Sequence, residues 1–251
     1  MKNFLPILIA FILLSFLSCQ KAEGPNSLGG DPKTEFTNVG DTTSAHFGLQ
    51  QIGLGNDYLS VDFVVKENNN GIVTSVGKFR TDTAFTHKLD TVLGTATLPP
   101  QFKEAIRNRL IKAFNVKIDS SDKNNIKMEF EIKTKVTSEG IQDFAHSNGN
   151  TSKPFTLVKY SAKVGDKYEF TDDDGNKFVR EVTYRSTTDD YDLIFWRIKV
   201  IKVEETVVEG PYKDIFGKIT YYTNHKFGLV GVEWTTYEGK VLGFMIWPPN
   251  L

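Results

Sequence analysis

Residues 125–136 read NIKMEFEIKTKV and show the clearest alternation of apolar and charged residues in the chain. Successive side chains of a β-strand point to opposite faces of the sheet. The stretch therefore predicts a half-exposed antiparallel strand whose charged side chains are available for cross-strand pairing. The apolar set is Ile126, Met128, Phe130 and Ile132, and the charged set is Lys127, Glu129, Glu131 and Lys133.

Strand patterns recur on both sides of this segment. Residues 58–66 and 72–85 are expected to form a hairpin around the turn cluster at 67–71. The Asp174-Gly175 pair predicts a tight turn within the charged run 172–176. The other expected strands are 155–160, 167–171, 177–184, 192–207, 218–224, 229–237 and 241–247.

One helix is predicted, at about 99–114. Prolines suit its first turn, and Phe102, Ile106 and Leu110 recur at four-residue spacing to form an apolar stripe. One helix and about ten strands predict an α+β fold of mostly antiparallel β-structure. A sheet of this size must curl or close, so we expect a curved sheet, half-barrel or barrel with the helix covering one face.

The beginning of the chain has the layout of a secretory leader. Phe4 to Leu17 is almost wholly apolar but shorter than the roughly 20 residues of a membrane-spanning helix. Phe16-Leu17-Ser18-Cys19 resembles the bacterial lipoprotein box, in which a small residue precedes an invariant cysteine. The resemblance implies a signal peptide at 1–18, palmitate and other acyl chains on Cys19, and a membrane anchor. Ordinary cleavage near Ser18 and an uncleaved anchor are the alternatives.

The residues after the leader indicate where the protein is held and which chemistry is excluded. Residues 19–45 are rich in Gly, Asn, Thr and Ser and are expected to form the lipidated cysteine and a flexible tether. Gln20 stands where Asp often signals inner-membrane retention, which favours the outer membrane, on its periplasmic face or at the cell surface. Cys19 is the single cysteine, so once it is acylated disulfides and thiol chemistry are excluded. The net charge of −1 gives no support for nucleic-acid binding.

The folded part is expected at 46–251, either as one β-rich domain or as subdomains 46–153 and 154–251. We predict no catalytic residue, metal or cofactor in it. Gly175 is misplaced for a helix-flanked calcium loop, so the acidic run is interpreted as a charged hairpin turn. The four histidines lack the spacing of zinc ligands, and no nucleophile motif stands in a suitable context. The histidines are His46, His87, His146 and His225.

Aromatic residues crowd the last 57 positions, where they either pack a core or line a binding surface. Trp196, Tyr222, Trp234 and Trp247 are the candidate ligand-binding residues on a concave sheet that holds a lipid, a glycan or an apolar peptide, or that binds an envelope partner. A structural or assembly lipoprotein without a pocket is the alternative, and an envelope hydrolase is the least favoured. The sequence does not indicate an oligomeric state.

Residues 157–247 resemble a group of poorly characterised Gram-negative bacterial envelope lipoproteins. The shared features are Val164-Gly165-Asp166, the Asp-Gly turn, and Tyr221-Tyr222 followed by Phe227-Gly228-Leu229-Val230. The resemblance implies a curved antiparallel sheet, similar to the half-barrels of lipoprotein carriers, and brings no catalytic residues. Independently of it, Gly165 and Gly228 stand at strand entries, and we expect a positive φ or a bulge at one of them.

Overall fold

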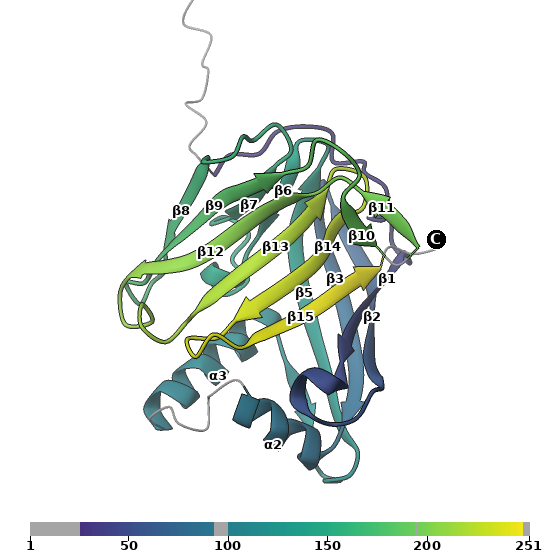
Figure 1. The fold of residues 1–251 in the computed structure, drawn as a ribbon, viewed down its shortest axis with the longest axis vertical. Coiled ribbons are helices and arrows are strands. Elements are labelled where there is room, and N and C mark those ends of the chain that lie inside the picture. The colour runs from purple at the N-terminus through teal and green to yellow at the C-terminus, as the bar shows by residue number, and fades with distance from the viewer. Residues whose placement is uncertain (1–25, 93–99, 194, 248–251) are drawn as a thin grey trace, which may run out of the picture.

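The computed structural model describes residues 26–92, 100–193 and 195–247 (Figure 1). The predicted signal peptide and Cys19 lie outside the described residues. The large sheet contains β1 (Thr42–Gly48), β2 (Tyr58–Asn69), β3 (Ile72–Thr81), β4 (Lys117–Asp119), β5 (Ile126–Thr137), β6 (Gly140–Asp143), β7 (Phe155–Lys159), β8 (Lys167–Thr171), β9 (Lys177–Arg185), β12 (Ile201–Glu209), β13 (Lys218–Asn224), β14 (Gly228–Thr235) and β15 (Val241–Trp247). The other elements are a small hairpin, β10 (Tyr191–Leu193) and β11 (Trp196–Ile198), the helices α2 (Thr83–Val92) and α3 (Pro100–Phe114), and the 3-10 turns η1 (Leu49–Ile52) and η3 (Ala145–Ser147).

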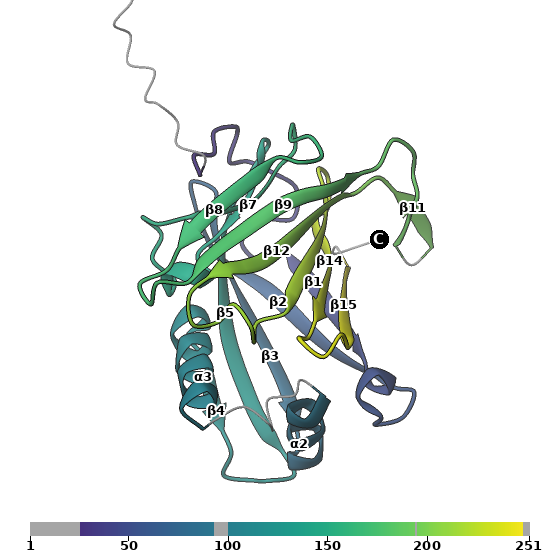
Figure 2. The same cartoon turned by 60° about the vertical axis from the view of Figure 1, so that its left-hand side comes forward.

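The 13-stranded sheet is antiparallel and curls until it is nearly closed, as a barrel would be. Its order is β7-β6-β5-β3-β2-β1-β15-β14-β13-β12-β9-β8, with β4 added beside β5. The two end strands, β7 and β8, come together (Figure 2), where the backbone N–H of Lys159 donates to the Tyr168 hydroxyl at 3.1 Å. The expected α+β fold with a curled antiparallel sheet is confirmed.

Strand β5 matches the alternating stretch at 125–136 almost residue for residue. Glu129 on β5 accepts from Lys78 of β3 at 2.8 Å and from Lys117 of β4 at 3.1 Å, so the predicted cross-strand pairing is present. Hydrogen bonds from these two lysines hold the pKa of the Glu129 carboxyl below its ordinary value.

Two stretches differ from the expected elements. The strand expected at 72–85 ends at Thr81, because the Asp82 carboxylate accepts from the backbone N–H of Phe85 at 2.8 Å and caps the unpredicted helix α2. The long strand expected at 192–207 is divided into β10, β11 and β12.

Helix α3 lies where the sequence predicts it, and α2 is a second helix at the same end of the sheet (Figure 1). In the described part of the chain, no helix is long and apolar enough to cross a membrane.

Residues 26–45 are fixed to the sheet, which differs from the flexible tether expected through residue 45. Asn26 bonds three strands: Nδ2 donates to the Glu169 carbonyl of β8, Oδ1 accepts from the Thr156 N–H of β7, and its carbonyl accepts from Gln142 of β6. Leu28 is buried, and β1 already begins at Thr42.

The predicted turn geometry is present at both glycines and at the acidic run. Gly165 has φ +95° and Gly228 has φ +73°, a region that residues with a Cβ adopt rarely. The Asp172 carboxylate accepts from the backbone N–H groups of Asp174 at 3.0 Å and Asn176 at 2.8 Å, so the run is a hairpin turn. Among the described residues, no three His, Cys, Asp or Glu side chains form a metal-binding group.

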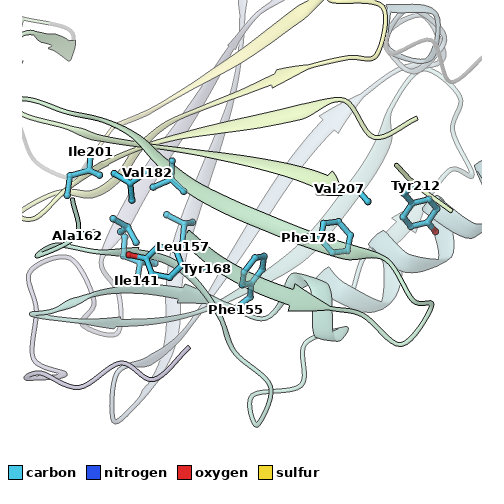
Figure 3. Packing of buried hydrophobic residues seen from close by; sticks show 12 residues of the cluster. Ile141, Phe155, Leu157, Ala162, Tyr168, Phe178, Val182, Ile201, Val207 and Tyr212 are labelled. Atoms are coloured by element: carbon cyan, nitrogen blue, oxygen red, sulfur yellow. The ribbon is translucent and has the colours of Figure 1, made fainter. Parts of the chain in front are cut away.

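A large apolar cluster fills the interior near the closure of the sheet (Figure 3). It joins β6 and β7 at one end of the strand order to β8, β9 and β12 at the other. Hydrophobic burial stabilises this contact but does not fix the position of one strand relative to another, because it is non-directional. Its buried members are Ile141, Phe155, Leu157, Val158, Ala162, Tyr168, Phe178, Val182, Ile201, Val203, Val207 and Tyr212.

A buried ion-pair network lies beside this cluster, and its hydrogen bonds fix how the strands are positioned relative to one another. Arg180 of β9 is fully buried and bonds Glu205 of β12 at 2.6 Å, Asp143 of β6 at 2.7 Å and the Phe155 carbonyl of β7 at 3.2 Å. Burial opposes ionisation of Glu205, but Arg180 and then His146 outweigh it and hold the pKa of this carboxyl well below its ordinary value. We call the sheet face that carries Arg180 and Glu205 the inner face, and the opposite face the outer face.

The network continues to helix α3. His146 Nε2 lies 2.9 Å from Glu205, and its Nδ1 lies 3.1 Å from Arg109 of α3. Arg109 also bonds Asp172, the carboxylate that forms the acidic turn. Burial raises the pKa of Asp172, but hydrogen bonds from Asn176 and Arg109 have the larger opposite effect. The pKa of this carboxyl is therefore below its ordinary value. One chain of charges therefore ties the helix to both ends of the sheet.

Replacing Glu205 tests this network. Glu205→Gln should lower the free energy of unfolding by about 3–5 kcal/mol, because it leaves a buried guanidinium without its charge partner. The neighbouring Glu204→Gln is the control, since Glu204 pairs with Lys218 on the outer face, where both side chains are about one third exposed, and it should cost less than about 1 kcal/mol. Urea unfolding of each variant measures both values.

The same comparison has a defined pH dependence. The pKa of Glu205 is lower in the folded chain, so its contribution is complete above the ordinary glutamate value of about 4.3 and is lost as the pH falls below it. The difference between the native chain and Glu205→Gln should shrink over that range. Equal costs for the Glu204 and Glu205 replacements would contradict the assignment.

Candidate functional site

A transverse row of the outer face forms the floor of a groove. Strand register places Tyr222 of β13 opposite Gly231 of β14, Gly231 opposite Met245 of β15, and Met245 opposite His46 of β1. Because paired residues share a face, all four lie on the outer side of the sheet. Above them is a groove of about 640 Å³, within the range of small-ligand sites.

Gly231 creates the depth of this groove. A Cβ at this position would lie 2.6 Å from the Tyr191 hydroxyl. The Tyr191 side chain can therefore lie over residue 231 only because glycine has no side chain. The Tyr191 ring stacks on Tyr222 with centroids 5.0 Å apart. The hairpin β10–β11, which carries Tyr191, is packed on the outer face through Leu193 and Ile198.

One end of the groove holds two polar groups without hydrogen-bond partners in the described structure. The rings of His46 and Trp247 lie 3.8 Å apart, and His46 Nε2 and Trp247 Nε1 are buried and unbonded. Burial lowers the pKa of His46, although Asp62 opposes this, so the imidazole is neutral at pH 7. Trp Nε1–H is a donor only, and an unpaired buried donor calls for an explanation.

The other end presents a carboxylate. Glu233 accepts from the Tyr222 hydroxyl at 2.6 Å, and within the described ranges no Lys or Arg nitrogen lies within 4 Å of it. Burial, and secondly Glu233, raises the pKa of Tyr191 to about 12. The same causes raise the pKa of Tyr222 further. Both phenols therefore stay neutral beside an anionic centre.

Beyond the end of β1, the wall of the groove is formed by the side chain of Gln51, which bonds the backbone of β15. β1 ends at Gly48, yet Gln51 of η1 donates to the Gly243 carbonyl at 3.0 Å and accepts from the Gly243 N–H at 2.6 Å. The β1–β15 pairing ends at Phe47 and Phe244, and the Gln51 amide satisfies both backbone groups of the next residue, Gly243. Tyr58 borders the same wall and is 67% exposed.

The four predicted ligand-binding residues are divided between three places. Tyr222 and Trp247 line the groove together. Trp234 follows Glu233 directly and points to the inner face, where its Nε1 donates to the Phe216 carbonyl at 2.9 Å. Trp196 lies on the β10–β11 hairpin and is 47% exposed.

Sequence reasoning missed His46, Tyr191, Gly231 and Glu233 as groove residues. His46 and Gly231 lie far apart in the chain, and only the sheet order brings β1 and β14 to either side of β15. The one available signal was Gly231 itself, because a glycine inside a strand often marks a close approach.

Comparison with known proteins gives one structural similarity. No protein-family model matches the chain, and no curated protein matches it. A solved structure described as a "putative exported protein with YmcC-like fold" from Bacteroides fragilis is 7% identical, with a TM-score of 0.40, and the match covers 84% of this chain and 95% of that one. This degree of similarity does not indicate a shared function.

A pair of glycine replacements tests the geometry of the groove. Gly231→Ala should displace Tyr191 and lower stability by about 1–3 kcal/mol through overpacking. Gly243→Ala is the matched control on the next strand, since its Cβ would make an ordinary contact of 3.7 Å with Glu233. Thermal unfolding measures the difference, and equal effects would show that Tyr191 does not occupy this space.

Proposed function

We propose that the protein is a lipid-anchored bacterial envelope protein that binds an amphipathic ligand in the outer-face groove and has no catalytic activity. The observation that carries this is the joint presence of an aromatic floor, two unbonded buried donors or acceptors, and one unneutralised carboxylate in a single groove. Ligand sites are mostly apolar surfaces with a few polar groups that fix orientation.

The arrangement defines the ligand that would fit. Its apolar part would lie along Met245 and Trp247, and a donor or cationic group would meet Glu233 at the far end. His46 Nε2 and Trp247 Nε1 have less than 1 Å² exposed, so a ligand atom would reach them only after a neighbouring side chain moves. The Tyr222 ring already has Lys202 Nζ 5.0 Å from its centroid and Tyr191 stacked on it, so the preference for an amine or a similar group rests on Glu233.

The buried ionisable groups support a role in folding and not in chemistry. The side chains of His146 and Glu205 are 10% and 0% exposed, so a substrate could not reach them without opening the network. A structural or assembly lipoprotein without a ligand remains the second hypothesis, and a ligand-binding experiment separates the two.

Tryptophan fluorescence in the unlipidated chain 20–251 tests the groove. The chain has three tryptophans, so Trp196→Phe with Trp234→Phe leaves Trp247 alone. A brominated long-chain alkylamine should quench Trp247 strongly. In the matched control, Trp196→Phe with Trp247→Phe, the remaining Trp234 on the inner face should be quenched far less.

The head group of the probe tests the role of Glu233. A brominated fatty acid of the same length should bind about tenfold more weakly than the amine, the change that 1.4 kcal/mol produces. Glu233→Gln should remove this preference. Equal quenching of Trp247 and Trp234, or none of either, would favour the ligand-free structural protein.

The anchor is tested separately. Cells that express the native chain with labelled palmitate should yield a labelled protein in the membrane fraction, because two or more acyl chains anchor a protein stably. Cys19→Ala should abolish the label, since it removes the single thiol of the chain. Incorporation of label into Cys19→Ala would show that the lipoprotein interpretation is wrong.

A further inference from the structure

A second groove, of about 930 Å³, lies between the loops at the other end of the strands from the two helices. Residues 26–41 and the start of β12 and β14 run along this end, at the top of Figure 1. It is lined by Thr34, Glu35, Ser138, Tyr160, Arg185, Ser186, Lys199, Val200, Ile201, Thr223, Asn224, His225 and Lys226. None of these residues lines the outer-face groove.

The charge of this groove is predominantly positive. It contains Arg185, Lys199 and Lys226, against the single carboxylate of Glu35. None of the three cations has a carboxylate oxygen within 4 Å among the residues that the structure describes, whereas Lys78, Lys117 and Lys218 elsewhere on the sheet are paired. The groove therefore presents positive charge that no described carboxylate pairs, together with hydroxyl groups.

Buried side chains fix the backbone that carries the cations. Asn224 is 6% exposed; its Nδ2 donates to the Lys199 carbonyl at 2.7 Å, and its Oδ1 accepts from the Lys226 N–H at 2.8 Å. Ser186, beside Arg185, accepts from the Val200 N–H at 2.9 Å. One buried amide thus holds two lysine-bearing loops in place.

The guanidinium of Arg185 is also held in position. Its Nη1 donates to the carbonyls of Tyr160 at 2.8 Å and Ala162 at 3.0 Å. No bond of Nε or Nη2 to a described residue is present, so these donors are free for a bidentate contact. Arginine in this geometry suits phosphate, and lysines add point charges.

Chain length limits how far the predicted anchor can lie from the first described residue. Asn26 is seven residues after Cys19, and an extended chain spans at most about 3.6 Å per residue, or about 25 Å here. Thr34 and Glu35, which follow this segment, line the groove itself. An acylated Cys19 would therefore keep this end of the molecule near the lipid head groups.

We propose that this groove binds the phosphate group of an anionic membrane lipid. The inference rests on the proposed anchor for the source of the phosphate, and on the groove for its chemistry. Basic clusters held near a membrane bind anionic lipids preferentially. In this assignment Arg185 contacts the phosphate directly, and Lys199 and Lys226 complete the charge.

Lysine footprinting of the lipidated full-length protein tests the proposal. The protein is inserted through its own anchor into vesicles of phosphatidylcholine, with or without phosphatidylglycerol, and is treated with an amine-acetylating reagent before mass spectrometry. Phosphatidylglycerol should slow the modification of Lys199 and Lys226 by about threefold or more, because bound phosphate shields both amines. Lys163, exposed at the same end, and Lys213, in the turn after β12, should react equally in both vesicles.

Each control decides one part of the proposal. Arg185→Gln should remove the protection of Lys199 and Lys226 while circular dichroism stays unchanged. Equal rates in the two vesicles, or equal slowing at Lys163, would overturn the site. Equal protection by free inorganic phosphate in phosphatidylcholine vesicles would overturn the lipid as its source. A protein that fails to associate with either vesicle would instead contradict the anchor of the proposed function.

Discussion

The burial of one guanidinium, that of Arg180, is the constraint on which the closure of the sheet depends. A buried charge is costly unless it is paired and hydrogen-bonded, and the partners of Arg180 come from β12, β6 and β7. These strands stand near opposite ends of the strand order. Apolar packing alone would tolerate a shift of one end against the other, whereas the Arg180 contacts allow one arrangement. Burial lowers the pKa of Arg180, but Asp143 and Glu205 outweigh it and raise the pKa above its ordinary value.

The two faces of the sheet have different surroundings, and two adjacent tyrosines show the difference. Tyr221 points inward and donates to Glu205 at 3.1 Å, while Tyr222 points outward and donates to Glu233 at 2.6 Å. The inner glutamate is neutralised by Arg180 and stabilises the fold. The outer glutamate has no Lys or Arg partner within 4 Å among the described residues and lies at the edge of a groove. A period of two thus separates the buried network from the groove within one strand.

Local patterns predicted what local physics determines. Alternation identified β5, and in β12 the same period of two places Glu205 in the interior and leaves Glu204 on the outer face. The proline start of α3 and the acidic turn followed from their own residues. Helix α2 was missed because its start signal, the Asp82 cap, lies at the end of a Thr-rich strand pattern that continues into the helix.

Contacts between distant elements were beyond sequence reasoning. Arg109 is one of several basic residues on α3, and nothing local distinguishes it from Arg107, yet it alone of the two is drawn inward to His146 and Asp172. Both grooves likewise depend on strand order, which brings β1 beside β15 and places the loop at Lys199 against the turn at Lys226.

The bonds of Asn26 have a mechanical consequence. This residue touches β6, β7 and β8, and so it crosses the seam where the curled sheet meets itself. Any force that arrives from the N-terminal side reaches these strands before it reaches β1. Tension on the chain would therefore be resisted by the seam as a whole, through three bonds on neighbouring strands, and would not peel a single strand from the sheet.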